Sequence, residues 1–365
     1  MRDAARIERV TARAYTIPTD APEADGTFAW KKTTIVIAEV AAGGKTGLGY
    51  TYSSEVIRGL IEGPLAEVAR GHDAFDIPAV WAAMVGQVRN LGWRGLCANA
   101  ISAVDVALWD LKARLLDLPL AKLLGQRRES VPVYGSGGFT SYDDAQLARQ
   151  LGWWAGEGCR WVKMKVGTES DRDLHRAKVA RDAIGDATEL FVDANGALPR
   201  KKALWFAQAY HDRFGVTWFE EPVSSDDLEG LRILRDRARP GMDIAAGEYG
   251  YEPFYFKRML DAGAVDVLQA DATRCCGYTG FLRAAALCDA HPLPLSAHTA
   301  PALHLPVCCA APRLRHLEWF HDHARIEGML FDGAPRIQGG VIRPDLSRPG
   351  HGLELKAGEA EPYAV

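Results

Sequence analysis

The sequence predicts an α/β fold in which a barrel of parallel strands follows a smaller α+β unit, and three observations support this prediction. Short apolar runs recur along the last two thirds of the chain, roughly 22–30 residues apart, with helical stretches between them. Ionisable residues stand at the ends of most of these runs. The preceding residues, 1–125, have a different pattern, because strand-like segments come first and helical segments follow.

The composition limits the class of protein. The 365 residues are enough for one large domain or two ordinary ones, and with 48% hydrophobic residues the chain can bury a full core. A net charge of −4 gives no reason to expect a nucleic-acid or anionic-membrane partner. The start of the chain lacks the apolar core of a secretory signal, and no run reaches the roughly 18 apolar residues of a membrane span. The seven cysteines, an odd number, indicate buried thiols in a reducing cytoplasm.

Residues 1–125 are predicted to form an α+β domain. Between Ile7 and Tyr52 the pattern is strand-like, and "AGGKTG" between two apolar runs is typical of a hairpin turn. From Ser54 to Leu124 the pattern is helical, since apolar residues recur at three- and four-residue steps in "ANAISAVDVALWDLKARLLD".

Eight apolar runs after this domain predict eight parallel strands. In order they are "VPVYGSGG", "WVKMKVG", "LFVDAN", "VTWFEEP", "DIAAGE", "VDVLQAD", "LPLSAH" and "HLEWF". Eight βα units close most economically into a TIM-type barrel, which we assign to residues 126–330. The remaining residues, 331–365, are rich in Pro and Gly, and we expect them to return to the first domain.

The second run, "RWVKMKVG", alternates apolar residues with Lys163 and Lys165. Alternate side chains of a strand point to opposite faces, and in a barrel the outer face lies under helices. We therefore expect both lysines to point into the barrel. Neighbouring ammonium groups and a nearby divalent cation lower a lysine pKa, so one of the two could act as a base near neutral pH. The simpler alternative is that they only neutralise carboxylates.

Three carboxylates end successive strands: Asp193 in "DAN", Glu220 in "EEP" and Glu248 in "GE". One acidic residue after a strand is usually a helix cap or a solvated group. Repetition in phase with the strands instead indicates a site at the mouth of the barrel. Unpaired carboxylates this close would raise each other's pKa, and a hard divalent cation relieves the repulsion. Oxygen ligands without Cys or His among them favour Mg²⁺ over zinc.

His298 and Asp271 end the seventh and sixth runs. Asp271 could accept a hydrogen bond from the imidazole and so fix its tautomer and basicity. A lysine on the second strand and a histidine on the seventh would face opposite sides of a bound substrate. This arrangement suits two bases, or a base and an acid, that act at one carbon or at adjacent carbons.

Together these motifs resemble the enolase superfamily, and within it the mandelate racemase subgroup. The resemblance extends over nearly the whole chain and includes "SAVDVALWDLKAR", the KxK of "VKMKVG", "DAN", "EEP", "GE", the Asp271 and His298 pair, and "LEW". It implies a (β/α)₇β TIM-type barrel with an α+β capping domain, built from the N-terminal segment and the C-terminal tail. It also implies essential Mg²⁺ and abstraction of a proton α to a carboxylate, with an enediolate intermediate.

The resemblance implies roles for the residues already named. The three carboxylates at the strand ends would be the metal ligands. Lys165 would be the base on one face of the substrate, with Lys163 as the neighbour that lowers its pKa and contacts the substrate carboxylate. His298, together with Asp271, would be the base or acid on the other face.

Further positions follow from the same resemblance. Glu318 would hydrogen-bond the substrate carboxylate, and Asn195 would contact the α-hydroxyl. Arg274 stands where the family often has a lysine, and its effect on specificity stays open. His321 and His323, in "FHDH", are expected in an exposed or second-shell loop, with contact to the far end of the substrate as the alternative.

Specificity is expected in the capping loops. Residues 17–30, "IPTDAPEADGTFAW", stand where the family has a mobile lid, and the acidic residues of this segment disfavour a long polyanionic substrate unless they are simply solvated. Trp30, Tyr50 and Tyr52 are candidates for the pocket wall, with packing inside the cap as the alternative.

The lysine and histidine–aspartate arrangement resembles that of many acid sugar dehydratases. Dehydration of an acid sugar to a 2-keto-3-deoxy sugar acid is therefore the first hypothesis. A racemase or epimerase of a 2-hydroxy acid is the alternative, and a non-catalytic protein that binds metal or sugar acid is a third. We expect a cytoplasmic homo-oligomer, a dimer or an octamer, that acts on a small-molecule carboxylate and binds neither nucleic acid nor membrane.

Overall fold

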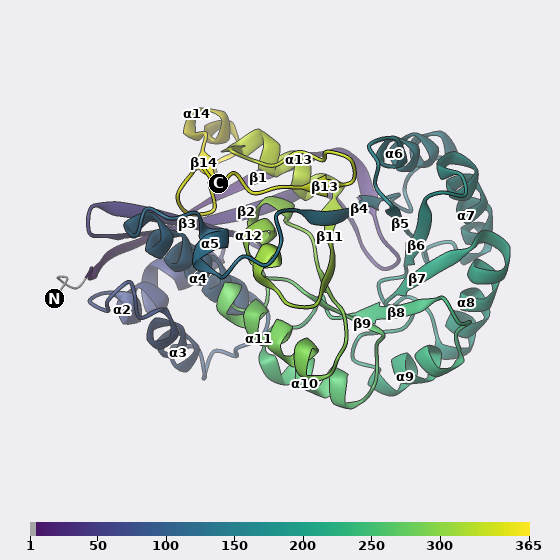
Figure 1. Cartoon of the computed structure of the whole chain (residues 1–365), viewed down its shortest axis with the longest axis horizontal. Helices are drawn as coiled ribbons and strands as arrows, with labels where there is room; N and C mark the ends of the chain where they lie inside the picture. The colour runs from purple at the N-terminus through teal and green to yellow at the C-terminus, as the bar shows by residue number, and fades with distance from the viewer. Residues whose placement is uncertain (1–4) are drawn as a thin grey trace.

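The structure is a computed structural model and describes residues 5–365. An α+β unit formed by the first part of the chain lies beside a barrel of parallel strands (Figure 1). None of the helices in the described part of the chain combines the length and the apolar character that a membrane span needs. All seven cysteines are buried and free, as the sequence predicts.

The N-terminal unit contains an antiparallel sheet of three strands, β1 (Ile7–Ala24), β2 (Ala29–Ala42) and β3 (Lys45–Tyr52). Gly43 and Gly44 form the predicted hairpin turn, both with positive φ, which glycine adopts without a steric penalty. The helical part follows, with α1 (Ile57–Leu60), η1 (Ile61–Leu65), α2 (Ala66–Ala69), α3 (Ile77–Gln87), α4 (Leu96–Leu115) and α5 (Leu120–Leu123).

The barrel has eight parallel strands, and it closes where the last strand pairs with the first. The strands are β4 (Val131–Gly137), β5 (Trp161–Lys165), β6 (Glu189–Asp193), β7 (Val216–Glu220), β8 (Asp243–Ala246), β9 (Val267–Ala270), β10 (Leu295–Ala297) and β11 (Leu314–Phe320). The helices between them are α6 (Asp144–Gly156), α7 (Ser170–Ile184), α8 (Arg200–Phe214), α9 (Leu228–Arg237), α10 (Pro253–Asp261), α11 (Gly277–Ala290) and α12 (Pro301–Ala310). Seven βα units and a final strand confirm the predicted (β/α)₇β architecture.

The two faces of β5 separate as the alternation predicts. Val162, Met164 and Val166 are fully buried in the hydrophobic core between the strands and the outer helices. Lys163 points into the barrel, with its Nζ 5.3 Å from the centre of the Tyr134 ring. Rings from several strands form an aromatic layer inside the barrel, and the Lys163 ammonium group lies over one of them, the Tyr134 ring.

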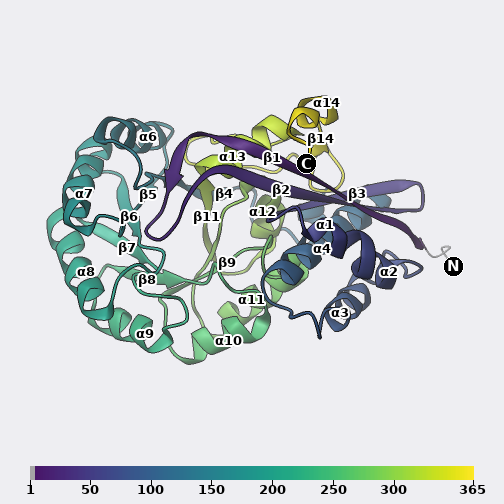
Figure 2. The ribbon, with the colours of Figure 1, turned by 180° about the vertical axis from the view of Figure 1, so that it is seen from behind.

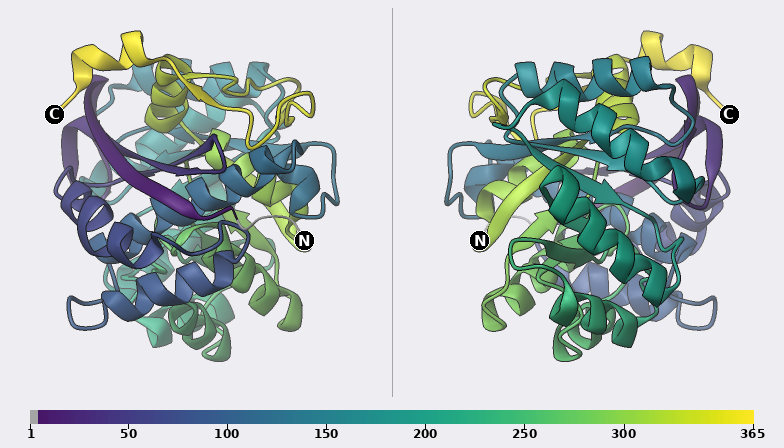
Figure 3. Two further views of the ribbon diagram at one scale, coloured as in Figure 1. Left: turned by 90° about the vertical axis from the view of Figure 1, so that its left-hand side faces the viewer. Right: turned by 90° about the vertical axis from the view of Figure 1, so that its right-hand side faces the viewer.

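The C-terminal segment touches both parts of the molecule. It begins with α13 (His321–Leu330), and short elements follow: β12 (Phe331–Asp332), β13 (Val341–Ile342), β14 (Glu354–Leu355), α14 (Ala357–Ala360) and η2 (Glu361–Tyr363). Strand β13 pairs with β4 of the barrel, whereas the Val365 N–H donates to the Ala14 carbonyl of β1. Figure 3 shows the C-terminal segment beside the N-terminal strands. The division at residues 125 and 330 stays a prediction.

Helix α4 carries two buried carboxylates: Asp105 ties the N-terminal unit to the barrel, and Asp110 ties α4 to β3 of the same unit. Asp105 accepts hydrogen bonds from the Thr279 N–H (3.0 Å) and hydroxyl (2.6 Å) near the start of α11. Asp110 accepts from the Leu48 N–H (2.8 Å) and from Arg114 (2.7 Å). Burial raises the pKa of Asp105 to about 7, so this carboxylate depends on its hydrogen-bond donors. The "SAVDVALWDLKAR" motif is therefore a docking helix.

We expect Asp105→Ala to destabilise the protein by about 1–3 kcal/mol, because the buried N–H and hydroxyl of Thr279 would lose their acceptor. Chemical unfolding followed by circular dichroism would measure the change. The exposed Glu67, on α2 of the same unit, gives the control Glu67→Ala, for which we expect a change within about 0.5 kcal/mol. Equal stability of the two variants would contradict the docking role of Asp105.

Candidate active site

A cavity of about 370 Å³ lies at the carboxyl ends of the barrel strands, beneath the end of the β1–β2 hairpin. Figure 2 shows this hairpin as a ribbon that extends from the N-terminal unit across the barrel. At its tip the Asp25 carbonyl accepts from the Thr140 and Thr168 hydroxyls. Gly26 lies against the barrel so closely that a Cβ there would come 2.3 Å from the Ala194 carbonyl oxygen. The hairpin therefore forms the roof of the cavity.

The three strand-end carboxylates that the sequence singles out lie together in the structure. Asp193 ends β6, Glu220 ends β7 and Glu248 follows β8, and all three are buried. One oxygen from each lies within 4.8 Å of the other two. Burial and the Asp193 carboxylate raise the pKa of Glu220 to about 8, and Glu248 faces the cationic groups of His298 and Arg274. This crowded oxygen set fits a hard divalent cation such as Mg²⁺.

The two lysines of β5 lie directly beside this carboxylate cluster. Lys163 Nζ is 2.6 Å from Glu220 Oε1 and 2.9 Å from Glu318 Oε1. Lys165 Nζ is 2.5 Å from Asp193 Oδ2, which follows from the pairing of Lys165 with Asp193 between β5 and β6. The sequence predicts this proximity only through the barrel topology.

The pKa of Lys165 differs from the expectation. Burial works to lower the pKa, and Lys163 adds repulsion, but the Asp193 carboxylate outweighs both and the pKa is raised. Lys163 thus acts in the expected direction, but Asp193, a metal-ligand candidate, outweighs it, and a Lys165 that is neutral near pH 7 stays a prediction. A cation on Asp193 would compete with Lys165 for the same carboxylate and so favour release of the lysine proton.

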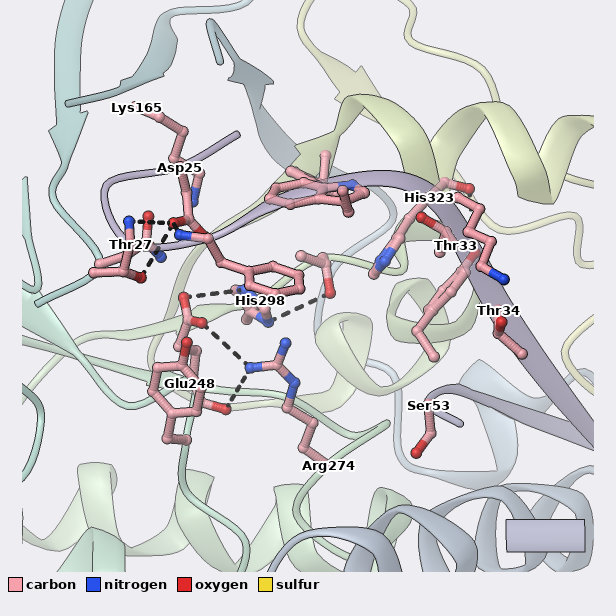
Figure 4. Close-up of a pocket in the computed structure, with 18 residues that line it drawn as sticks. Asp25, Thr27, Thr33, Thr34, Ser53, Lys165, Glu248, Arg274, His298 and His323 are labelled. Carbon is pink, nitrogen blue, oxygen red and sulfur yellow. Dashed lines mark hydrogen bonds and ion pairs between the residues drawn. The ribbon is translucent and has the colours of Figure 1, made fainter. Parts of the chain in front are cut away.

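His298 lies nearly across the barrel from Lys165. Four strands separate β5 from β10 on one side and two on the other. His298 Nδ1 is 2.8 Å from Asp271 Oδ2, and the Asp271 carboxylate accepts a hydrogen bond from it. On the other side of the ring, Nε2 lies 3.3 Å from Glu248 Oε2 (Figure 4). Burial works to lower the pKa of His298, but the nearby carboxylates raise it to about 9. The imidazolium is thus the dominant form at neutral pH.

Glu318 and Asn195 also lie at the site. Glu318 accepts from the Ser136 hydroxyl (2.5 Å) and the Thr299 N–H (3.2 Å). Burial works to raise its pKa, but Lys163 lowers it to about 2. Ionised Glu318 is an acceptor only, so the predicted hydrogen bond to a substrate carboxylate would require that it gains a proton. Asn195 lines the cavity, and its buried Oδ1 has no hydrogen-bond partner.

Sequence reasoning gave no role to some residues that the structure places at the site. Arg274 lines the cavity with its Nη1 3.3 Å from Glu248 Oε1 and its Nε 3.6 Å from Asp271 Oδ2, so it links the metal-ligand candidates to the histidine pair. Glu221 follows Glu220 with φ 38°, a conformation uncommon outside glycine, and burial strongly raises its pKa. The doubled acid in "EEP" was the available signal for Glu221.

Some of the residues expected in the cap and the last loop line the cavity, and others do not. Trp30 and Tyr52 line the cavity, whereas Tyr50 is buried and donates to Glu327 Oε1 (2.6 Å). His323 is buried and lines the cavity, with its ring stacked on Tyr52 at a centroid distance of 3.4 Å. His323 is therefore neither exposed nor in a loop, and the choice between a supporting position and contact with the far end of the substrate stays open. His321 faces Asp20 of the hairpin instead.

Two family models match the chain. The "Mandelate racemase / muconate lactonizing enzyme, N-terminal domain" matches residues 9–125, and the "Enolase C-terminal domain-like" family matches residues 144–360. The 3,6-anhydro-alpha-L-galactonate cycloisomerase of Streptomyces coelicolor is 33% identical over 361 residues, which cover 96% of this chain and 97% of that enzyme. The L-talarate/galactarate dehydratase of Salmonella typhimurium is 33% identical over 308 residues, which cover 82% of this chain and 77% of that enzyme.

Solved structures agree over almost the full chain. A mandelate racemase/muconate lactonizing enzyme-like protein from Rubrobacter xylanophilus has a TM-score of 0.97 and 54% identity, covering 99% of this chain and 100% of its own. A racemase from Streptomyces coelicolor with bound magnesium has a TM-score of 0.92 and 31% identity, covering 98% and 100%. The L-talarate dehydratase of Polaromonas, in complex with Mg and L-glucarate, has a TM-score of 0.88 and 31% identity, covering 99% and 98%.

We expect Glu220→Gln to lose most of the Mg²⁺ affinity, because it removes one of three charged oxygen ligands. Isothermal titration calorimetry with Mg²⁺ would measure this loss, and exhaustive chelation of the unchanged protein should abolish turnover until Mg²⁺ is returned. Glu157→Gln, at an exposed position after α6, is the control and should bind Mg²⁺ normally. Unchanged Mg²⁺ binding by Glu220→Gln would show that the carboxylate cluster is not the metal site.

Proposed function

This chain belongs to the mandelate racemase / muconate lactonizing enzyme family of the enolase superfamily, and from that premise we propose that it is an Mg²⁺-dependent dehydratase of an acid sugar. The observation that carries the proposal is the placement of Lys165 and His298 nearly across the barrel from each other, beside one buried carboxylate cluster. A base and an acid in this relation can act on two faces of one bound substrate.

The wall of the cavity supports a polyhydroxylated substrate. Many of its side chains carry neutral hydrogen-bonding groups, namely Thr27, Thr33, Thr34, Ser53, Asn195 and His323. Two of these groups, Asn195 Oδ1 and His323 Nδ1, are buried atoms without a hydrogen-bond partner among residues 5–365. Because unpaired buried polar atoms are costly, these two positions favour a ligand that supplies hydroxyl groups.

The first step assigned to the chain is removal of the α-proton. Asp193, Glu220 and Glu248 would hold Mg²⁺, which supplies positive charge for the substrate carboxylate when it is bound. Lys163 adds a second fixed positive charge within the barrel. Lys165 would then take the α-proton on Nζ, and the preorganised charges would stabilise the electron pair that remains.

The second step assigned to the chain is loss of the β-hydroxyl. The electron pair from the α-carbon forms a double bond to the β-carbon while the bond from the β-carbon to its hydroxyl oxygen breaks. His298 would donate its Nε2 proton, so that the hydroxyl leaves as water. The enol that results takes one proton from solvent at C3 and becomes the 2-keto-3-deoxy acid. Asp271 keeps the imidazole oriented, because it holds Nδ1 at 2.8 Å.

An isomerase is the second candidate, and the comparisons give it specific support. A cycloisomerase is among the relatives that match nearly the full chain, and a racemase is among the similar structures. The first step would be the same. The outcome then depends on whether the group on the next carbon is a hydroxyl, a ring oxygen, or a group that does not leave.

We expect Lys165→Ala and His298→Asn each to lower turnover by about 10²–10⁴-fold, the usual contribution of a positioned acid or base. Steady-state kinetics with a panel of mono- and diacid sugars would measure this. The two variants should also differ in kind: His298→Asn should keep exchange of the α-proton with solvent deuterium, because Lys165 still takes that proton, whereas Lys165→Ala should lose it. Lys178→Ala, on the exposed surface of α7, is the control. Turnover within a few-fold of wild type in both variants would exclude the two-sided site.

We expect the product to be a 2-keto-3-deoxy sugar acid, detectable with semicarbazide. For a reaction run in D₂O, NMR should find one solvent deuterium at C3, because the enol takes its proton there. Deuterium at C2 with no keto product would identify a racemase or epimerase instead. An isomer that has opened or closed a ring would identify a cycloisomerase.

A further inference from the structure

A second group of metal-ligating side chains lies outside the catalytic cavity, where the hairpin roof meets the last barrel strand. Asp20 and Glu23 belong to β1, and His321 begins α13 directly after β11. One ligand atom from each of the three lies within 4.8 Å of the others. His321 Nε2 is 2.9 Å from Asp20 Oδ2. We call these three residues the roof cluster.

An irregularity in β1 brings the two carboxylates together. The pairing of β1 with β2 is regular from Arg9 to Pro18, shifts register, and resumes at Glu23. Residues at positions i and i+3 of a regular strand point to opposite faces. Since the shift lies between Pro18 and Glu23, Asp20 and Glu23 can approach the same histidine.

Glu23 is the member of the roof cluster that most needs a partner. It is only 1% exposed and lies beside an aromatic cluster that includes Phe139, Tyr142 and Phe320. Its Oε2 accepts from the Trp30 indole N–H at 2.8 Å, but its buried Oε1 has no hydrogen-bond partner in the described part of the chain. Burial raises the pKa of Glu23 to about 9, so the group requires either a proton or a cation.

The neighbouring cation, Arg325, makes its hydrogen bonds to groups other than Glu23. Arg325 donates to Asp322 Oδ1 at 2.5 Å and to the Pro18 carbonyl at 2.8 Å. The Asp322 carboxylate in turn adds negative charge near Glu23 and contributes to its raised pKa. The surroundings of the roof cluster therefore leave Glu23 with excess negative charge.

We propose that Asp20, Glu23 and His321 form a second metal site, which binds a borderline divalent cation such as Zn²⁺ and joins the hairpin roof to the barrel. An imidazole beside two carboxylates selects Zn²⁺ over Mg²⁺, which prefers oxygen ligands alone. Ligand bonds of about 2.0–2.2 Å require the three atoms to rearrange around the ion, and the Nε2–Oδ2 pair, now at 2.9 Å, must open to admit it. The exposed Asp20 and the partly exposed His321 can supply this movement by side-chain rotation.

The site has access to solvent and a link to the catalytic cavity. A hollow of about 360 Å³, lined by Asp20, His321 and residues of α6, opens beside it and leaves room for entry of the ion and for water ligands. Trp30 donates to Glu23 and also lines the catalytic cavity. A metal in the roof cluster therefore fixes one wall of the catalytic cavity without touching the reacting groups.

The number of Zn²⁺ ions bound per chain tests the proposal. After dialysis against Zn²⁺ and removal of free ion, elemental analysis should find two in the wild type, because the catalytic carboxylates also accept zinc. It should find one in Glu220→Gln, one in His321→Ala, and none in the double variant. Asp20→Asn, at a more exposed position, should match His321→Ala. Zn²⁺ should also raise the Tm of Glu220→Gln but not that of the double variant.

The control is His175→Ala. His175 pairs with Asp144 at 2.7 Å on the surface, which reproduces the histidine–aspartate contact of the roof cluster without Glu23. This variant should still bind two Zn²⁺ ions. One Zn²⁺ in the wild type, or two in both His321→Ala and Asp20→Asn, would overturn the proposal. The count does not depend on turnover, so failure of the proposed dehydratase activity would leave it unaffected.

Discussion

The confinement of several carboxylates in a space from which water is largely excluded is the constraint on which the rest of this structure depends. Asp193, Glu220 and Glu248 meet at the mouth of the barrel, and Glu318 lies on the other side of Lys163. Two lysines, one arginine and one histidine are aimed at this group, yet the pKa of Glu220 remains raised. The protein is thus built around carboxylates that burial deprives of water, a cost that a divalent cation can offset.

Burial of the carboxylate cluster depends on how the N-terminal unit docks. Asp105 and Asp110 on α4 bind backbone donors, and Tyr50 on β3 donates to Glu327 on α13. These contacts fix the sheet from which the β1–β2 hairpin extends over the cavity. The same motif that identifies the family in the sequence therefore serves mainly to position the roof.

The phase of the strands made much of the site predictable. The ends of the barrel strands had to converge once eight βα units were recognised, and the alternation in β5 placed Lys163 and Lys165 inside. The directions of individual side chains and the register between strands were not predictable. Two residues of an α-helix turn through about 200° around its axis, so His321 and His323 point to nearly opposite sides of α13. Only His323 reaches the catalytic cavity. Lys165 pairs with Asp193 through strand register, which composition and spacing do not encode.

The roof is the end of a long two-stranded ribbon and not a free loop. Its strands continue into the sheet of the N-terminal unit, and from Arg9 to Ala24 the register of the ladder shifts between Pro18 and Glu23 alone. A ribbon of this kind resists bending where its hydrogen bonds are complete and yields where they are interrupted. The part of the ribbon between Pro18 and Glu23 is therefore where the backbone ladder over the cavity offers least resistance to bending, while the Asp25 carbonyl at the tip stays tied to Thr140 and Thr168 of the barrel.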